Sequence, residues 1–226
     1  MFEVSDDWIA AYPEAHAGLL VMRGVTNPLQ HPALEERKAA LEARLRARWA
    51  GEEQAMLASD PVLLAYQTYY RRFKKSYHVR LQLESLILKG RSLPRVSALV
   101  DAMFMAEMEH LLLTAGHDLE TLELPIRLDV ARGDEAYTLL RGEAQVLKAG
   151  DMMMADRAGV ISSILYGPDQ RTQITPGTQH VAYTVYAPPG AGAETVQQHL
   201  LAIQASVRLV SPEAQLELSR VFAAAA

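Results

Sequence analysis

The sequence has 226 residues, half of them hydrophobic, and its formal net charge at pH 7 is -5. This length allows one large domain or two small ones, and the negative charge excludes a protein that is basic throughout. The absence of cysteine excludes disulfides and thiolate chemistry. Neither a secretory signal nor an apolar run of about 18 residues is present, so we expect a soluble cytoplasmic protein with no membrane partner.

The N-terminal part, residues 1–91, is predicted to be mostly helical. Ser5 can cap a short helix that Pro13 ends, and residues 17–25 read as a buried strand. A longer helix is predicted over residues 31–49. Its apolar face is formed by residues at helical spacing, namely Leu34, Leu41, Leu45 and Trp49.

Further helices are predicted before the chain changes character. Asp60 and Pro61 are a cap and a first-position proline, which indicate that a helix begins there. Ser76 can cap the next helix. Pro94 opens a longer, methionine-rich helix that is predicted to run to about Thr114. The methionines are best explained as flexible core filler.

After Gly116 the sequence alternates between apolar and polar residues or forms short apolar runs, which is typical of strands separated by turns. The predicted strands lie within residues 125–131, 136–140, 143–156, 159–165 and 180–188. Residues 193–226 are predicted to form two closing helices, the second opened by Ser211 and Pro212. Because strands cluster, we predict an α+β fold in which a helical N-terminal part packs on an antiparallel sheet, as a single domain over residues 1–226.

The connection between the last two predicted strands carries more polar side chains than a turn requires. Gly167, Pro168 and Asp169 already suffice for a turn. The further polar residues are Arg171, Thr172, Thr175 and Thr178. We expect them to face a ligand, with Asp169 and Thr172 on the substrate, Arg171 on a phosphate or carboxylate, and the other two threonines holding a catalytic water. Alternatively, Arg171 pairs with Asp169 and only locks the loop.

His117 and Asp118 follow the methionine-rich segment directly. A carboxylate beside an imidazole can fix its tautomer and favour its charged form, so His117 is a candidate catalytic acid or base and Asp118 a candidate substrate contact. Adjacent residues in an extended segment point to opposite sides, however. In the alternative reading, Asp118 simply caps the turn that follows.

A second cluster, "YYRRFKKSYHVR", mixes cations with aromatic residues over residues 69–80. Arg71, Arg72, Lys74 and Lys75 could follow a phosphate backbone while the rings stack on bases, so we predict RNA contact here. The alternative is a solvated helix end, where the dipole favours cations. Glu107 and His110 have the Glu-x-x-His spacing of di-iron helices, but such sites need two units, so we expect neither metal nor cofactor.

The second half resembles a known module. "LPRVSALVDAM" (93–103), the segment "HDLETLELPIRLDVARGDEAYTLL" that starts at His117, and "TQHVAYTVY" (178–186) match the B3/B4 editing domain of the phenylalanyl-tRNA synthetase beta subunit in order and spacing, from about residue 92 to 187. The chain resembles a free-standing version of that domain. The family's pocket has a Thr-Asn pair where this chain has Met103 and Phe104, and a histidine where it has Ala115. Its glutamate and threonine fall near Asp169 and at Thr178.

This resemblance implies binding of tRNA or aminoacyl-tRNA, with possible hydrolysis of a wrongly formed aminoacyl ester as a second sieve. Because the ester is already activated, a held water and donors for the oxyanion suffice for that reaction. A second hypothesis is a non-catalytic protein that binds an amino acid or nucleotide on the same fold. A third is a subunit of a larger assembly, whose basic patches serve a protein partner.

Overall fold

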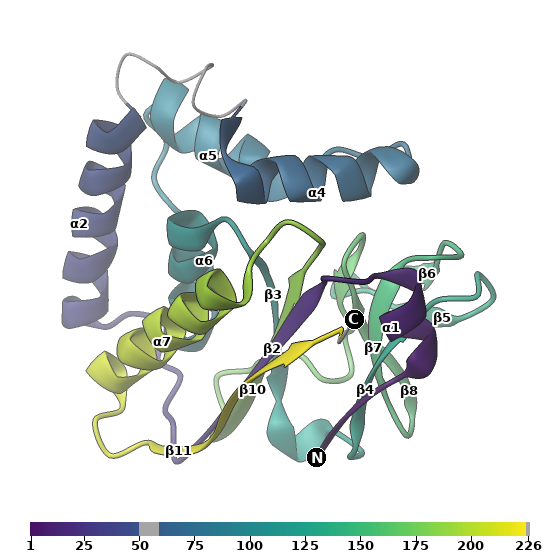
Figure 1. The fold of residues 1–226 in the computed structure, drawn as a ribbon. Helices are drawn as coiled ribbons and strands as arrows, with labels where there is room; N and C mark the ends of the chain where they lie inside the picture. Colours follow the sequence, from purple (N-terminus) through teal and green to yellow (C-terminus); the bar gives the residue numbers. More distant parts are fainter. Residues whose placement is uncertain (50–58, 225–226) are drawn as a thin grey trace.

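The computed structural model describes residues 1–49 and 59–224, in which two main sheets lie next to each other and helices cover one of them (Figure 1). Within these residues, the helix-covered sheet has four strands in the order β11-β2-β10-β3. Their bounds are β2 (His16–Arg23), β3 (Leu113–Asp118), β10 (His180–Ala187) and β11 (Gln215–Ala223). All its pairings are antiparallel, with His117 opposite Ala182 and Gly116 opposite Tyr183.

The second sheet has the order β1-β4-β7-β8-β9 within the described residues, and β1 pairs with β4 in parallel. Its strands are β1 (Phe2–Val4), β4 (Ile126–Val130), β7 (Met152–Asp156), β8 (Gly159–Ser163) and β9 (Gly167–Pro168). A small hairpin of β5 (Ala136–Thr138) and β6 (Ala144–Val146) lies beside it. The methionine triplet that begins at Met152 belongs to β7 and is buried, as expected of core filler.

The helices are α1 (Asp6–Ala11), α2 (Pro32–Trp49), α4 (Pro61–Arg72), α5 (His78–Leu88), α6 (Ala98–His110) and α7 (Ala193–Val210), with a short 3-10 turn η1 (Leu119–Thr121). Two predicted caps are confirmed: Ser5 accepts from the backbone N–H of Trp8, and Asp60 accepts from those of Val62 and Leu63. Such caps satisfy backbone donors that have no partner inside the helix.

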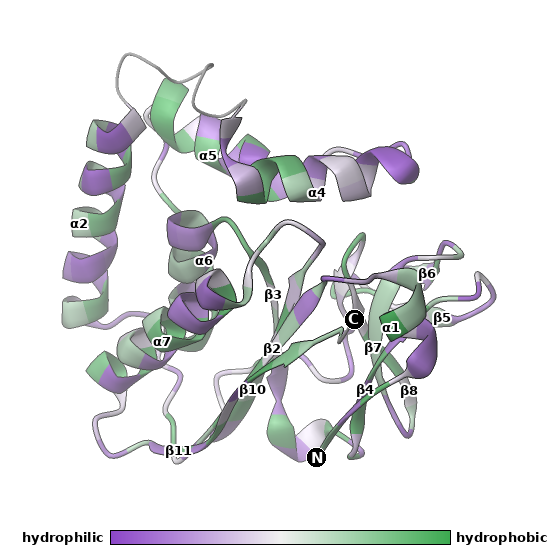
Figure 2. Ribbon diagram, in the orientation of Figure 1, coloured by the Kyte–Doolittle hydropathy of each residue, from purple (hydrophilic) through white to green (hydrophobic). Residues whose placement is uncertain are grey.

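The strand β10 shows how the layers are arranged. On one face, the hydroxyl of Tyr183 donates to the carbonyl of Leu99 on α6, at 2.9 Å. On the other face, Tyr186 and Ser162 of β8 share a hydrogen bond of 2.7 Å. Because side chains alternate along a strand, His117, which pairs with Ala182, lies on the face toward the second sheet, whereas Gly116 lies on the helix face. Figure 2 shows the hydrophobic residues of β2 and β10 at the centre of these layers.

Four element predictions were wrong. Residues 143–156, predicted as one strand, form β6 and β7, which belong to different sheets. Residues 215–223 form β11 and not a second closing helix, because they pair along the free edge of β2. The helix predicted to reach Thr114 ends at His110, because Leu111 has a φ of +61°, and Thr114 belongs to the buried strand β3. The N-cap of α5 is Tyr77 and not Ser76, and it provides no side-chain hydrogen bond.

The α+β class is confirmed, although residues 1–91 contribute two strands as well as helices. No helix within residues 1–49 and 59–224 is long and apolar enough to cross a membrane.

Candidate functional site

A hollow of about 270 Å³ lies between α6 and residues 168–174, at the edge strand β3. We call it the apolar hollow. Its walls are Val96, Val100, Met103, Phe104, Gly116, Leu140, Pro168, Gln173 and Ile174. Ligand sites in proteins have volumes from roughly 300 Å³ upward, so this space suits a small group such as one side chain.

Gly116 is the reason that the apolar hollow reaches the sheet. A Cβ atom on Gly116 would lie 2.6 Å from Cδ1 of Ile174 and 3.2 Å from the sulfur of Met103. Any larger residue would push the end of Ile174 out of its place. The absence of a side chain at this one strand position therefore lets α6 and the loop approach β3 around an open space.

The rim of the apolar hollow exposes hydrocarbon to water. Val96 and Leu140 are 49% and 48% exposed. Gln173, half-buried, provides the single polar side chain among the nine wall residues. A concave apolar surface with one polar group is the usual composition of a site that binds an apolar ligand and orients it through a polar atom.

Behind this hollow, three predicted site residues form a buried chain of hydrogen bonds. The hydroxyl of Thr172 donates to Asp169, which also accepts from the backbone N–H of Thr172 at 3.1 Å. Nδ1 of His117 lies 2.7 Å from the same hydroxyl. A hydroxyl has only one proton, and Thr172 donates it to Asp169. Nδ1 of His117 must therefore be protonated and donate to the hydroxyl oxygen. His117 is therefore the Nδ1–H tautomer.

His117 is not placed to act as a general base. Its ring is fully buried, and Nε2 has no hydrogen-bond partner within the described residues. Burial lowers the pKa of His117 to about 3; Asp156 opposes this shift and Arg171 adds to it. An imidazole with such a pKa is neutral and a weak base at pH 7.

A second group of hydrogen bonds joins the buried Asp118 and Thr178 to the backbone of the exposed Thr175. The hydroxyl of Thr178 donates to Asp118 at 2.7 Å and accepts from the backbone N–H of Thr175 at 2.9 Å. Asp118 also caps η1 by accepting from the backbone N–H of Glu120. The capping role that was the alternative reading of Asp118 is therefore present.

Arg171 is committed to an internal ion pair. Its two terminal nitrogens lie 3.0 and 2.8 Å from the two carboxylate oxygens of Asp156, and its Nε lies 3.6 Å from Asp169. Burial would raise the pKa of Asp156, but the Arg171 guanidinium and backbone N–H donors hold it below its usual range. The alternative in which Arg171 locks the loop accordingly fits the geometry.

The structure thus places the predicted catalytic and substrate-contact residues in two separate hydrogen-bonded groups, one that includes His117 and one that includes Asp118. None of these residues forms the wall of the apolar hollow. His117, Asp118, Asp169, Thr172 and Thr178 are buried, while Thr175 is exposed. Asp169 and Arg171 do line a separate hollow of about 200 Å³ beside β5. The expectation that His117 follows a helix was wrong, since it lies in β3.

Of the four predicted RNA-binding residues, two line the same cavity and two lie elsewhere. Arg71 and Lys75 line a cavity between α4 and α5. Arg72 instead stacks on the rings of Tyr12 and Phe73. Lys74 is exposed and lies outside that cavity, with a φ of +55°.

The sequence pattern of the B3/4 domain matches residues 65–222, which is more than half of the chain. The chain belongs to the B3/4 domain family. This result confirms the resemblance that the motifs indicated.

Among solved structures, an N-terminal fragment of the phenylalanyl-tRNA synthetase beta subunit from Pyrococcus horikoshii is similar to this B3/4 domain, with a TM-score of 0.48 and 11% sequence identity. The alignment covers 98% of this chain and 50% of that fragment, so this chain spans about half the fragment's length. No curated protein matches the sequence.

Met103 and Phe104 of this B3/4 domain both form part of the wall of the apolar hollow. These are the two positions where the resemblance places a Thr-Asn pair. Sequence reasoning missed Gly116, Ile174 and Leu140. A signal was available for Ile174, which is a large apolar residue inside the predicted polar connection between two strands.

Proposed function

We propose that this B3/4 domain binds aminoacyl-tRNA and takes the apolar side chain of the aminoacyl group into the apolar hollow. The observation that carries the proposal is the position of that hollow: Met103 and Phe104 form part of its wall, and the resemblance places the family's amino-acid pocket at these two positions. The replacement of polar residues by Met and Phe changes the preferred ligand from polar to apolar.

The preference follows from the cost of removing water. An aliphatic or aromatic side chain gains about 2 kcal/mol when it is buried against these walls. A serine or aspartate side chain would lose its hydration, with the amide of Gln173 as the one polar wall side chain to replace it. The expected discrimination of about 2 kcal/mol corresponds to roughly 30-fold in affinity.

Hydrolysis of the ester is the finer part of this proposal. Gln173 is the residue placed to hold a water or the ester carbonyl, and its backbone forms an antiparallel bridge with His117 of β3. In this mechanism His117, Thr172 and Asp169 are positioning residues, because their hydrogen bonds hold the segment that carries Gln173. In this reaction water attacks the ester carbonyl with no protein nucleophile, and the tetrahedral oxyanion then collapses and expels the ribose hydroxyl, which takes up the proton of the attacking water. The products are the free amino acid and the uncharged tRNA end.

The test uses amide analogues of charged tRNA ends, in which 3′-amino-3′-deoxyadenosine carries leucine, phenylalanine, serine or aspartate. Calorimetry should show roughly 30-fold tighter binding of the first two. Ile174→Ser should remove the difference, whereas Leu201→Ser, at a 44% exposed position on α7, should leave it intact. Equal affinities for all four analogues, or a preference for serine or aspartate, would contradict the proposal.

Deacylation is measured separately, as loss of radiolabelled leucine, phenylalanine or serine from tRNA. We expect faster loss of the apolar amino acids and slower loss after Gln173→Ala. Selective binding of the analogues without any ester loss would retain the binding function and remove the hydrolytic part.

One observation favours a second candidate, a protein that binds a free apolar amino acid without catalysis: the predicted catalytic imidazole of His117 has no exposed surface. Native mass spectrometry of freshly purified protein distinguishes the two. A retained amino acid, together with no affinity for the analogues, would support this candidate over the first.

A further inference from the structure

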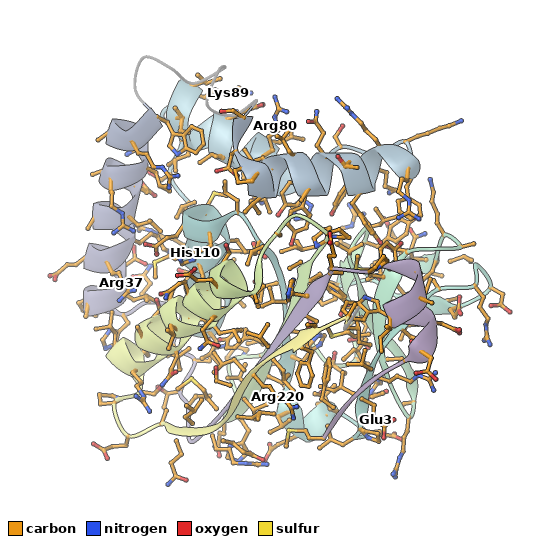
Figure 3. The ribbon with its side chains drawn as sticks, viewed as in Figure 1. Glu3, Arg37, Arg80, Lys89, His110 and Arg220 are labelled. Atoms are coloured by element: carbon orange, nitrogen blue, oxygen red, sulfur yellow. The ribbon has the colours of Figure 1, made fainter. Side chains whose placement is uncertain are left out.

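A second cavity, of about 270 Å³, lies between α4 and α5, and we call it the cationic pocket. Its walls are Leu63, Gln67, Tyr70, Arg71, Lys75, Ser76, Tyr77, Arg80, Leu81 and Glu84. Figure 3 shows Arg80 on α5 beside α4. Three basic residues and one acidic residue around one cavity are unexpected in a chain whose net charge is -5.

The charges of this pocket are not balanced. Arg80 pairs with Glu84 at 2.9 Å, four residues further along α5. Within the described part of the chain, Arg71 and Lys75 make no ion pair with an acidic residue. Two basic side chains therefore line the cavity without an ion-pair partner among the described residues.

Lys75 is held in an environment that disfavours its charge. Its ammonium lies 4.1 Å from the centre of the Tyr166 ring, which fixes its direction. Burial and the neighbouring Lys148 lower the pKa of Lys75, and Asp151 opposes this shift in part. An anion in the pocket would relieve both effects by offsetting the repulsion and restoring a partner for the ammonium.

The walls are fixed before any ligand arrives. The hydroxyl of Tyr70 donates to the carbonyl of Ile164 at 2.5 Å, and that of Tyr77 donates to the carbonyl of Leu111 at 2.9 Å. Tyr77 also stacks on Tyr66, with 4.1 Å between ring centres. A rigid pocket loses little conformational entropy when it binds.

We propose that the cationic pocket binds a phosphate group of a single-stranded RNA end, with Arg71 and Lys75 on the phosphate oxygens and Ser76 and Gln67 as additional donors. A guanidinium forms paired hydrogen bonds with phosphate, and an ammonium adds a point charge. The RNA source rests on the proposed function. A short segment of the chain connects the two cavities and supports this source. Tyr166, whose ring contacts Lys75, lies two residues before Pro168, which lines the apolar hollow.

The test measures fluorescence anisotropy of a labelled, uncharged 12-nucleotide RNA that ends in CCA, over a range of salt concentrations. The Arg71→Gln/Lys75→Gln variant should bind roughly tenfold or more weakly, and the slope of log K against log salt should become shallower by about 1.4, the value for two lost contacts to single-stranded RNA. The matched control is Lys89→Gln/Arg208→Gln, which removes the same charge at exposed positions outside the pocket. It should change affinity less than twofold.

A second measurement uses the unmodified chain and does not depend on the variant folding. Inorganic phosphate should displace the RNA more effectively than chloride at the same ionic strength, because the pocket binds phosphate and does not only screen charge. Titration with adenosine monophosphate then separates the sources. Binding of the monophosphate with no RNA binding would assign the pocket to a small phosphate ester instead of an RNA end.

Equal weakening by the two double variants, together with equal displacement by phosphate and chloride, would overturn the proposal. Its failure is distinguishable from failure of the proposed function, because the RNA used here carries no aminoacyl group and the analogues that test the apolar hollow carry no phosphodiester.

Discussion

Gly116 shows how much one atom can decide at the residue scale. A Cβ there would come 2.6 Å from Cδ1 of Ile174, so Gly116→Ala should push Ile174 into the apolar hollow. We expect a loss of analogue binding of tenfold or more and a loss of stability of about 1–3 kcal/mol from overpacking. Calorimetric titration and urea unfolding measure the two effects.

The control for this change is Gly142→Ala, at a glycine with open space around it but a φ of +83°. It tests whether a strained glycine substitution alone weakens binding. Unchanged affinity in Gly116→Ala would show that the ligand does not enter the apolar hollow.

Thr172 connects two buried groups that have few other partners. Thr172→Val keeps the shape but removes the hydroxyl between His117 and Asp169, both of which are buried. Leaving such groups unpaired should cost about 1–3 kcal/mol in urea unfolding. The exposed Thr175→Val is the comparison and should cost less.

The tautomer of His117 can be tested directly by nitrogen NMR. Because burial lowers its pKa to about 3, the ring should stay neutral, protonated on Nδ1, as the pH falls from 7 to 5. A protonated imidazolium at pH 6 would show that water or an anion reaches Nε2, and would return His117 to consideration as a catalytic acid.

At the scale of elements, the segment from Gly167 to Thr178 is held by three anchors: the pair of Arg171 with Asp156, the hydrogen bond of Thr172 with His117, and that of Thr178 with Asp118. The polar residues that suggested a recognition loop in the sequence are therefore largely used to fix the loop. The side chains of Gln173 and Ile174 remain available to the apolar hollow.

Removing the first anchor should loosen this segment without unfolding the sheets. We expect Arg171→Gln to increase amide hydrogen exchange within residues 169–178 by several-fold, while the amides of β10 stay protected, because low-stability loops open locally. Arg141→Gln, at a 77% exposed side chain, is the control. Unchanged exchange in Arg171→Gln would mean that the other two anchors suffice.

At the scale of the whole molecule, two buried carboxyl groups make stability depend on pH. Burial raises the pKa of Glu107 to about 8 and that of Asp151 to about 7. Hydrogen bonds from the backbone N–H of Thr114 and from the hydroxyl of Tyr69 oppose these shifts only in part. Between the ordinary carboxyl pKa and these values, the folded state holds protons that the unfolded state has released.

Stability should therefore be highest near pH 5 and fall as the pH rises toward 8, with a slope of about 1.4 kcal/mol per pH unit for each such proton. Glu107→Gln should make the decrease of the unfolding free energy with pH shallower by the contribution of one proton. Glu213→Gln, at an exposed position, should leave this pH dependence unchanged. Urea unfolding at pH 5, 6, 7 and 8 provides the measurement. A stability that rises over this range would contradict the assignment of Glu107 as a protonated group.

The start of some elements could be predicted from the sequence alone, because it depends on local chemistry. Ser5, Asp60 and Pro61 determine where α1 and α4 begin, because a cap acts on backbone groups within its own turn. The family, too, was readable from motif order in the second half, and the match over residues 65–222 confirms it.

Tertiary structure decided the rest. Residues 215–223 became a strand because β2 offered an unpaired edge, and strand pairing outweighs a weak helical pattern. Side chains alternate between the two faces of β3. His117 therefore lies between the two sheets and Gly116 lies at the apolar hollow, although the two residues are neighbours in sequence. Which face of a strand is buried depends on distant partners, so the sequence alone could name the polar residues of the loop but not the direction in which they point.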